Sequence, residues 1–172
     1  MNRIFLSIMV ILMFAGCQPK EAADNQQAPD MAQRQEASRK LTVEAVVLLN
    51  QKNYQGSVTA LDSAIKFDPT NQEAYMILGQ MLIKSGEYVR ASDFLDNAAK
   101  NFPDNGIIYY MLGIAFKMDG KKLPAMLAAR RSMEIFKNAN DQENLKMASV
   151  LMEEINKVND ANTKVAKGIG AK

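Results

Sequence analysis

The sequence contains no histidine, and its 172 residues include a single cysteine, Cys17. Without histidine, a serine or cysteine nucleophile lacks its usual general base, and a zinc site of histidine and cysteine is excluded. One cysteine also excludes an intramolecular disulfide. No glycine-rich phosphate loop is present, and the adjacent carboxylates Glu153 and Glu154 point in different directions on a helix. We therefore expect no catalytic residue, no bound metal and no cofactor.

An excess of charge of one sign is missing as well. The 21 lysines and arginines nearly balance the 19 aspartates and glutamates, which leaves a net charge of +2. This balance gives no general reason to expect a nucleic-acid partner. The hydrophobic share of 48% and the charged share of 23% are ordinary for a folded soluble protein, and the length suits one domain.

The first sixteen residues have the three parts of a secretory signal peptide, which we assign to residues 1–16. Arg3 is the basic start, residues 4–15 are apolar, and Ala15-Gly16 is a small-residue cleavage site. The apolar run is about a dozen residues, whereas a helix needs about 20 to span a bilayer. A removable signal is therefore expected rather than a transmembrane helix.

The segment Phe14-Ala15-Gly16-Cys17 resembles the bacterial lipobox, with Phe14 where that family usually has leucine. The resemblance implies cleavage before Cys17 and acylation of this residue with palmitate-type chains, which hold a protein firmly on a membrane. Gln18 follows the cysteine, in place of the aspartate that typically retains lipoproteins at the inner membrane. The resemblance therefore favours the outer membrane of the cell envelope, on its periplasmic side.

Two segments are too polar to bury a core. Residues 17–37, which begin with the lipidated cysteine, are rich in Gln, Ala, Asp and Glu, and we interpret them as a flexible tether. Residues 159–172 are rich in Lys, Asn and Gly, and we interpret them as a disordered tail.

Between these segments, apolar and breaker residues recur at an offset of 34. One set is Tyr75, Leu78, Gly79, Gly86 and Ala91, which recur as Tyr109, Leu112, Gly113, Gly120 and Ala125. A second set is Tyr54, Leu61, Ala64 and Pro69, which recur as Tyr88, Leu95, Ala98 and Pro103. Helical spacing on both sides of a breaker makes each period a helical hairpin. A 34-residue helix-turn-helix period is the signature of the tetratricopeptide repeat, which this chain resembles over about 120 residues.

The resemblance implies an all-α solenoid of three helix-turn-helix repeats with a C-terminal capping helix. We place this domain at 38–158, with repeats at 38–71, 72–105 and 106–139 and the cap at 140–158. Thr70 with Glu73 predicts a capping box at the start of the second repeat. Asn140 with Glu143 predicts the start of the capping helix in the same way.

In this family the first helix of each hairpin lines a concave groove that receives a segment of another protein. The corresponding residues beside the repeat motif predict a groove at Met76, Ile77, Gln80, Ile83, Ile107, Tyr110, Met111, Ile114 and Met118, and the first repeat offers Val46, Leu49 and Asn50. The alternative for each is burial between neighbouring helices. No convergent basic set is present for the carboxylate clamp that binds chaperone C-termini, because Arg39, Lys84 and Lys117 are spread along the chain.

These observations favour a membrane-anchored scaffold that binds an apolar or amphipathic segment of an envelope protein. Two alternatives remain open: a self-associating structural lipoprotein, and a cytosolic adaptor if Cys17 is not acylated. A second candidate surface is basic and comprises Lys121, Lys122, Arg130 and Arg131. It is either an ordinary solvated helix face or a site for anionic lipid headgroups or cell-wall polymers.

Overall fold

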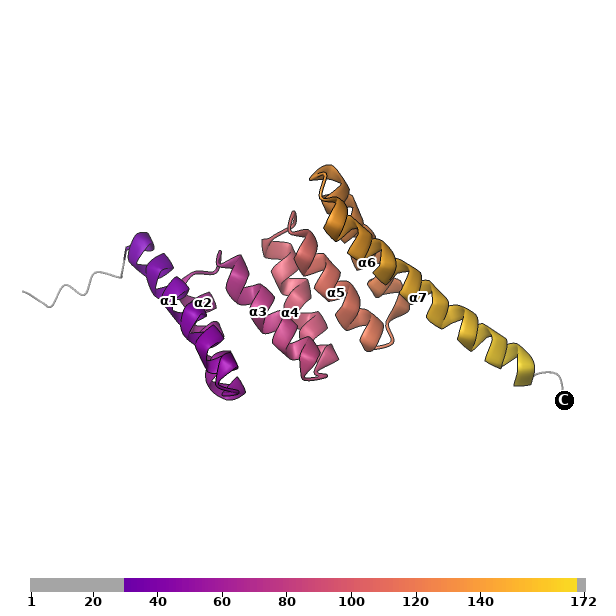
Figure 1. Cartoon of the computed structure of the whole chain (residues 1–172), viewed down its shortest axis with the longest axis horizontal. Coiled ribbons are helices and arrows are strands. Elements are labelled where there is room, and N and C mark those ends of the chain that lie inside the picture. The colour runs from indigo at the N-terminus through magenta and orange to yellow at the C-terminus, as the bar shows by residue number, and fades with distance from the viewer. Residues whose placement is uncertain (1–29, 170–172) are drawn as a thin grey trace, which may run out of the picture. The chain divides into compact units, whose positions relative to one another are not determined.

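The computed structural model describes residues 30–169, with side chains described as far as Lys157. Over that range the chain forms seven α-helices and no strand (Figure 1). The helices are α1 (Met31–Asn50), α2 (Tyr54–Phe67), α3 (Gln72–Lys84), α4 (Tyr88–Asn101), α5 (Gly106–Met118), α6 (Lys122–Asn138) and α7 (Gln142–Ile169). The predicted all-α fold is confirmed here. The predicted signal peptide, Cys17 and the tether as far as residue 29 lie outside the described range.

The helices pack against one another in chain order. α1 with α2, α3 with α4 and α5 with α6 form three hairpins, and α7 packs on the last of them. The first helices of the second and third hairpins, α3 and α5, also touch, and α5 touches α7 as well. Among the described helices, none is both long enough and apolar enough to cross a bilayer.

The turn inside each hairpin repeats one backbone motif. Gly86 and Gly120 have φ of +79° and +75°, and Lys52 has φ of +61° at the equivalent place in the first hairpin. The next residue in each case donates its N–H to the carbonyl five residues earlier, which closes a Schellman-type helix end. Glycine adopts this left-handed backbone without steric cost, whereas lysine is strained there.

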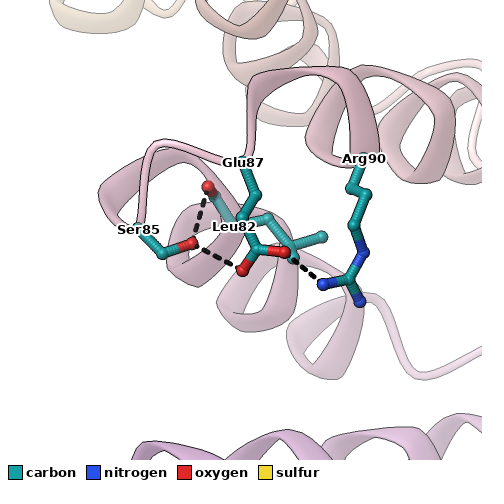
Figure 2. A network of polar contacts seen from close by, with 4 residues as sticks. All are labelled: Leu82, Ser85, Glu87 and Arg90. Atoms are coloured by element: carbon teal, nitrogen blue, oxygen red, sulfur yellow. Dashed lines mark hydrogen bonds and ion pairs between the residues drawn. The ribbon is translucent and has the colours of Figure 1, made fainter.

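A small polar network supports the turn between α3 and α4 (Figure 2). The Ser85 hydroxyl lies 3.0 Å from both the Leu82 carbonyl oxygen and a Glu87 carboxylate oxygen, and it donates to one at a time. Arg90 donates to the other Glu87 oxygen, one turn into α4. The hydrogen bond from Arg90 lowers the pKa of Glu87 most, and the hydrogen bond from Ser85 lowers it further. The carboxylate thus links the end of α3 to the start of α4.

The main core is built from the repeat-motif residues. Tyr75 is buried and stacks on Phe94 at a ring-centroid distance of 5.5 Å, with Phe102 edge-on at 5.2 Å. Gly79 is buried one turn later, and a Cβ there would come within 2.5 Å of Leu95 Cδ2 on α4. The glycine therefore lets the two helices of this hairpin approach closely, which offsets its helix penalty of about 1 kcal/mol.

A second core cluster joins α7 to the third hairpin. Leu95 of the second repeat corresponds to the smaller Ala129 in the third, which leaves room near Gly113. Leu151 of α7 occupies this room, because its Cδ2 lies 3.1 Å from where a Gly113 Cβ would be. Ala148, Leu151 and Ile155 are all buried, whereas Met147 and Val150 are exposed on the helix. The predicted C-terminal capping helix therefore packs one buried face against the third hairpin.

The N-terminal helix begins earlier than the sequence suggested. α1 starts at Met31, inside the segment interpreted as a tether up to residue 37. Residues 31–37 are good helix formers with no proline after Pro29. Arg34 also donates its Nε–H to the carbonyl of Phe67 at 3.1 Å, which ties this first turn to the end of α2. The tether prediction is wrong for these residues.

The C-terminal helix is longer than predicted, and two caps differ. α7 runs to Ile169, through most of the segment interpreted as a disordered tail, because no proline interrupts it. Asn71 caps α3 by accepting the Ala74 N–H, while Thr70 bonds to Asp68 instead of forming a capping box. Asp141, not Asn140, accepts the N–H of Asn144 at the start of α7, since Asn140 has φ of +55° and ends α6.

Candidate partner-binding surface

Asn71 fixes α3 beside α1. Its Oδ1 accepts the N–H of Ala74 at 3.1 Å, so the side-chain amide is free to point away from its own helix. Its Nδ2 donates to the hydroxyls of Ser38 at 2.8 Å and Thr42 at 3.0 Å on α1. Ser38 and Thr42 are buried and in turn donate to the carbonyls of Ala64 and Ser38. One amide thus caps a helix and joins it to the first helix of the preceding repeat.

Asn105 repeats this arrangement one period later. Its Oδ1 accepts the N–H groups of Ile107 and Ile108 at the start of α5. Its Nδ2 donates to Gln72 Oε1 at 2.7 Å and approaches the Met76 sulfur at 3.9 Å, both on α3. Because α1, α3 and α5 are held in the same register, residues 34 apart occupy corresponding places on neighbouring first helices.

We call these corresponding places the first-helix surface. Its rows are Thr42/Met76/Tyr110, Val43/Ile77/Met111, Val46/Gln80/Ile114, Leu49/Ile83/Lys117 and Asn50/Lys84/Met118. The nine residues predicted to form a groove all lie on α3 and α5, and all but Ile107 belong to these rows. The structure therefore brings the predicted residues onto consecutive turns of two adjacent helices.

The predicted groove residues differ in solvent exposure. Gln80 and Met118 are exposed, whereas Met111 is only 8% exposed and belongs to the main core. The others are half-buried. They pack against the main core or, for Ile114, against the cluster around α7; these residues are Met76, Ile77, Ile83, Ile107, Tyr110 and Ile114. Much of the third-repeat stripe is therefore core packing, and its available apolar surface is small.

The most open apolar part of the first-helix surface lies on α1. Val43 is 65% exposed and Val46 is 38% exposed, one turn apart on the same helix. Val43 corresponds to Ile77 and Met111 in the later repeats, where the side chains are increasingly covered. The prediction from sequence missed Val43, although subtracting 34 from Ile77 finds it.

The charges near this surface do not form an anion clamp. Lys117 pairs with Glu154 of α7, and this hydrogen bond, with the charge of Lys117, lowers the pKa of Glu154. Arg39 and Lys84 are exposed on α1 and α3. The pairing of Lys117 also links α5 to α7. The capping helix α7 therefore lies beside α5, the first helix of the third hairpin.

The candidate basic surface is partly neutralised. Lys121 pairs with Asp119 at 2.7 Å, and this hydrogen bond raises the pKa of Lys121. Arg131 lies 3.5 Å from Asp104 and 3.6 Å from Glu134, and it also donates to the Pro103 carbonyl. Two of the four predicted cations therefore already have structural partners.

A depression of about 490 Å³ lies at the turns that precede α5 and α7. Its lining includes the amides of Gln72 and Asn105 and the buried rings of Phe102 and Phe136. Of the nine predicted groove residues only Ile107 lines it. Between residues 30 and 157, no group of three carboxylates or cysteines is placed to hold a metal ion.

A comparison with sequence families matches part of the chain. Residues 48–113 match the sequence model described as the tetratricopeptide repeat. No curated protein sequence matches the chain.

Solved structures agree on the fold. The tetratricopeptide domain of Arabidopsis OM64 superposes with a TM-score of 0.62 at 18% identity, over 72% of this chain and 98% of that one. The first tetratricopeptide domain of Spaghetti (RPAP3), bound to the HSP90 peptide SRMEEVD, gives a TM-score of 0.63 at 13% identity, over 73% and 95%. MamA from Desulfovibrio magneticus RS-1 gives 0.52 at 20% identity, over 76% and 80%. These likenesses show that the described part of this chain has the fold of a tetratricopeptide repeat α-solenoid, and the sequence match over residues 48–113 agrees with it.

Proposed function

We propose that this chain is a lipid-anchored scaffold of the bacterial cell envelope that binds an apolar or amphipathic segment of a partner protein on its first-helix surface. The observation that carries the proposal is the apolar stripe on adjacent first helices, which opens to solvent at Val43 and Val46. The tetratricopeptide fold supports a role as a protein-interaction adaptor, since the Spaghetti domain of this fold is bound to a peptide.

The chemistry of the surface favours an apolar partner over an acidic one. Valine, isoleucine and methionine side chains dominate its rows, and Lys117 is already paired with Glu154. Methionine side chains adapt to different partner shapes, which suits a surface that receives a short helix or an extended segment. Of the three bases considered for an anion clamp, only Arg39 and Lys84 are exposed, and these lie on different helices.

The membrane anchor is proposed from the lipobox-type sequence that ends at Cys17. Acylation there would hold the domain at the membrane, with the polar segment up to Asp30 as a short tether. Gln18 after the cysteine favours the outer membrane, with the domain facing the periplasm.

Site-specific photocrosslinking in the native bacterium tests the partner-binding surface. A crosslinker at Val43 or Gln80 is expected to capture a discrete partner, whereas one at the exposed Thr59 of α2 serves as the matched control. Val46→Asp is expected to abolish capture without changing the helical circular dichroism, because Val46 is partly exposed. Equal capture at Thr59, or capture that survives Val46→Asp, would refute the proposed surface. A crosslinked product consisting of two copies would instead identify a self-associating protein.

Metabolic labelling with an alkyne fatty acid tests the anchor separately. The protein is expected to carry the label and to fractionate with outer membranes, and Cys17→Ser is expected to remove both properties. An unlabelled protein in the cytosolic fraction would contradict the anchor and favour a cytosolic adaptor.

A further inference from the structure

The second helix of the third hairpin differs in charge from its two counterparts. α6 carries four basic residues (Lys122, Arg130, Arg131, Lys137) and one acid (Glu134), a net charge of 4 − 1 = +3. α2 has one acid and one base, and α4 has two of each, so both are neutral. The repeat architecture alone does not require this difference.

The same helix also exposes two leucines. Leu123 is 66% exposed and Leu127 is 56% exposed, four residues apart on one face of α6. Neither packs in the two core clusters. The corresponding residues of α4 are Val89 and Asp93, so an apolar pair at these places is peculiar to α6.

Two of the bases beside these leucines are available. Lys122 precedes Leu123, and Arg130 lies one turn after Leu127. In the part of the chain with described side chains, neither Lys122 nor Arg130 makes an ion pair, unlike Lys121 and Arg131. The face formed by Lys122, Leu123, Leu127 and Arg130, which we call the α6 face, therefore combines exposed apolar side chains with unpaired positive charge.

We propose that the α6 face docks on the surface of an anionic phospholipid bilayer. The leucines would enter the headgroup boundary, as the apolar side of an interfacial helix does, while the two bases remain near the lipid phosphates. The charge favours lipid over a second copy of this chain, because two α6 faces of net positive charge repel each other. The two leucines favour lipid over a free polyanion, because phosphate contacts alone would leave them exposed.

This docking is independent of the proposed acyl anchor and of the first-helix surface. The α6 face lies on a second helix, and none of its residues belongs to the rows of first-helix residues. A tether that keeps the domain near the membrane would raise the effective concentration of the lipid surface and so strengthen a weak contact.

Vesicle binding of residues 30–172 tests the proposal without the anchor, since residues 31–172 form one compact unit that contains both described core clusters. The protein is expected to sediment with phosphatidylglycerol-containing vesicles and not with phosphatidylcholine vesicles. Binding is expected to fall as salt approaches about 1 M, where screening acts over about 3 Å. Lys122→Gln with Arg130→Gln is expected to reduce the partition coefficient by about fivefold for each base.

The leucines have a matched control in Val89, which is 54% exposed at the place corresponding to Leu123. Leu123→Ser with Leu127→Ser is expected to lower partitioning by roughly tenfold, whereas Val89→Ser leaves it within about twofold. Because the chain contains no tryptophan, Leu127→Trp provides a unique fluorophore whose emission shifts to the blue on vesicle binding.

Four outcomes would overturn the proposal. The first is wild-type protein that sediments with neither vesicle at low salt, and the second is a Leu123→Ser, Leu127→Ser variant that binds like wild type. Binding to heparin that is insensitive to the serine pair, without a shift of Leu127→Trp on vesicles, would identify a simple polyanion site. A concentration-dependent dimer that the same serine pair abolishes, without vesicle binding, would assign the face to a second copy. None of these outcomes bears on crosslinking at Val43.

Discussion

Replacing Asn71 separates the two roles of its side chain. Asn71→Ala removes the cap of α3 and also the two hydrogen bonds to Ser38 and Thr42 on α1. Asn71→Ser keeps a side-chain oxygen that can accept the Ala74 N–H, but it is too short to reach α1. The difference in unfolding free energy between the two variants measures the contribution of the cap. The loss of unfolding free energy in Asn71→Ser measures the contribution of the link between repeats.

The expected magnitudes follow from these contacts. A lost N-cap costs about 1 kcal/mol, and each intramolecular hydrogen bond contributes about 1 kcal/mol net. Asn71→Ala is therefore expected to lower the free energy of unfolding by about 3 kcal/mol, and Asn71→Ser by about 2 kcal/mol. Asn105→Ser is the matched control. Its lost amide bond goes to the exposed Gln72 rather than to buried hydroxyls, so we expect a cost of at most about 1 kcal/mol.

Urea unfolding of residues 30–172, followed by circular dichroism at 222 nm, measures these differences. The midpoint should move while the slope with urea stays constant, because the surface exposed on unfolding does not change. A cost for Asn71→Ser below about 0.5 kcal/mol would refute the inter-repeat role. So would equal costs for Asn71→Ser and Asn105→Ser, because only the Asn71 amide has buried partners on the neighbouring helix. A changed slope would show that the repeats no longer unfold together.

Three further predictions concern the turns, the cap and pH. Lys52→Gly is expected to stabilise the domain by about 0.5–1 kcal/mol, because it relieves a left-handed backbone, whereas Gly86→Ala should destabilise it by about 1 kcal/mol in the same urea assay. A Lys52→Gly variant that is less stable than wild type would contradict backbone strain at Lys52. Leu151→Ala is expected to cost about 2–5 kcal/mol by opening a cavity beside Gly113, and a cost near zero would exclude α7 as the cap. The depressed pKa of Glu154 means that its stabilising contribution is present above its unfolded pKa and is lost as pH falls through the folded pKa. Its NMR titration midpoint should therefore lie below the usual glutamate range and rise in Lys117→Met; an unchanged midpoint would show that the pairing is absent in solution.

The fold could be predicted largely from the sequence because its signals are local. Helical spacing around Tyr75 and Tyr109, with glycines at Gly86 and Gly120, is enough to predict hairpins and their period. The errors lie at boundaries, where contacts from elsewhere in the chain decide. Arg34 extends α1 by bonding to the end of α2, and no local signal in residues 31–37 indicates that partner. The capping asparagine was missed because Thr70 offered an equally good local motif.

The candidate site was less predictable. The 34-residue register places Val43, Ile77 and Met111 at equivalent points, yet their exposure runs from 65% at Val43 to 8% at Met111. Nothing in the three residues themselves determines this gradient. It depends on which helices lie beside each one. The basic cluster was likewise visible in the sequence, but only the structure separates the paired Lys121 and Arg131 from Lys122 and Arg130.

The sequence by itself determined the repeat, the turns and the hairpins, because periodic apolar spacing and left-handed glycines act within a few residues of chain. Only the tertiary structure decided what closes the array and what remains open. Leu151 completes the third hairpin because Ala129 is small and Gly113 leaves space beside it, a fit among three separate helices. Val43, Leu123 and Leu127 remain exposed because no helix in the described part of the chain packs over them. Burial is a property of neighbours in space, and the neighbours come from distant parts of the chain.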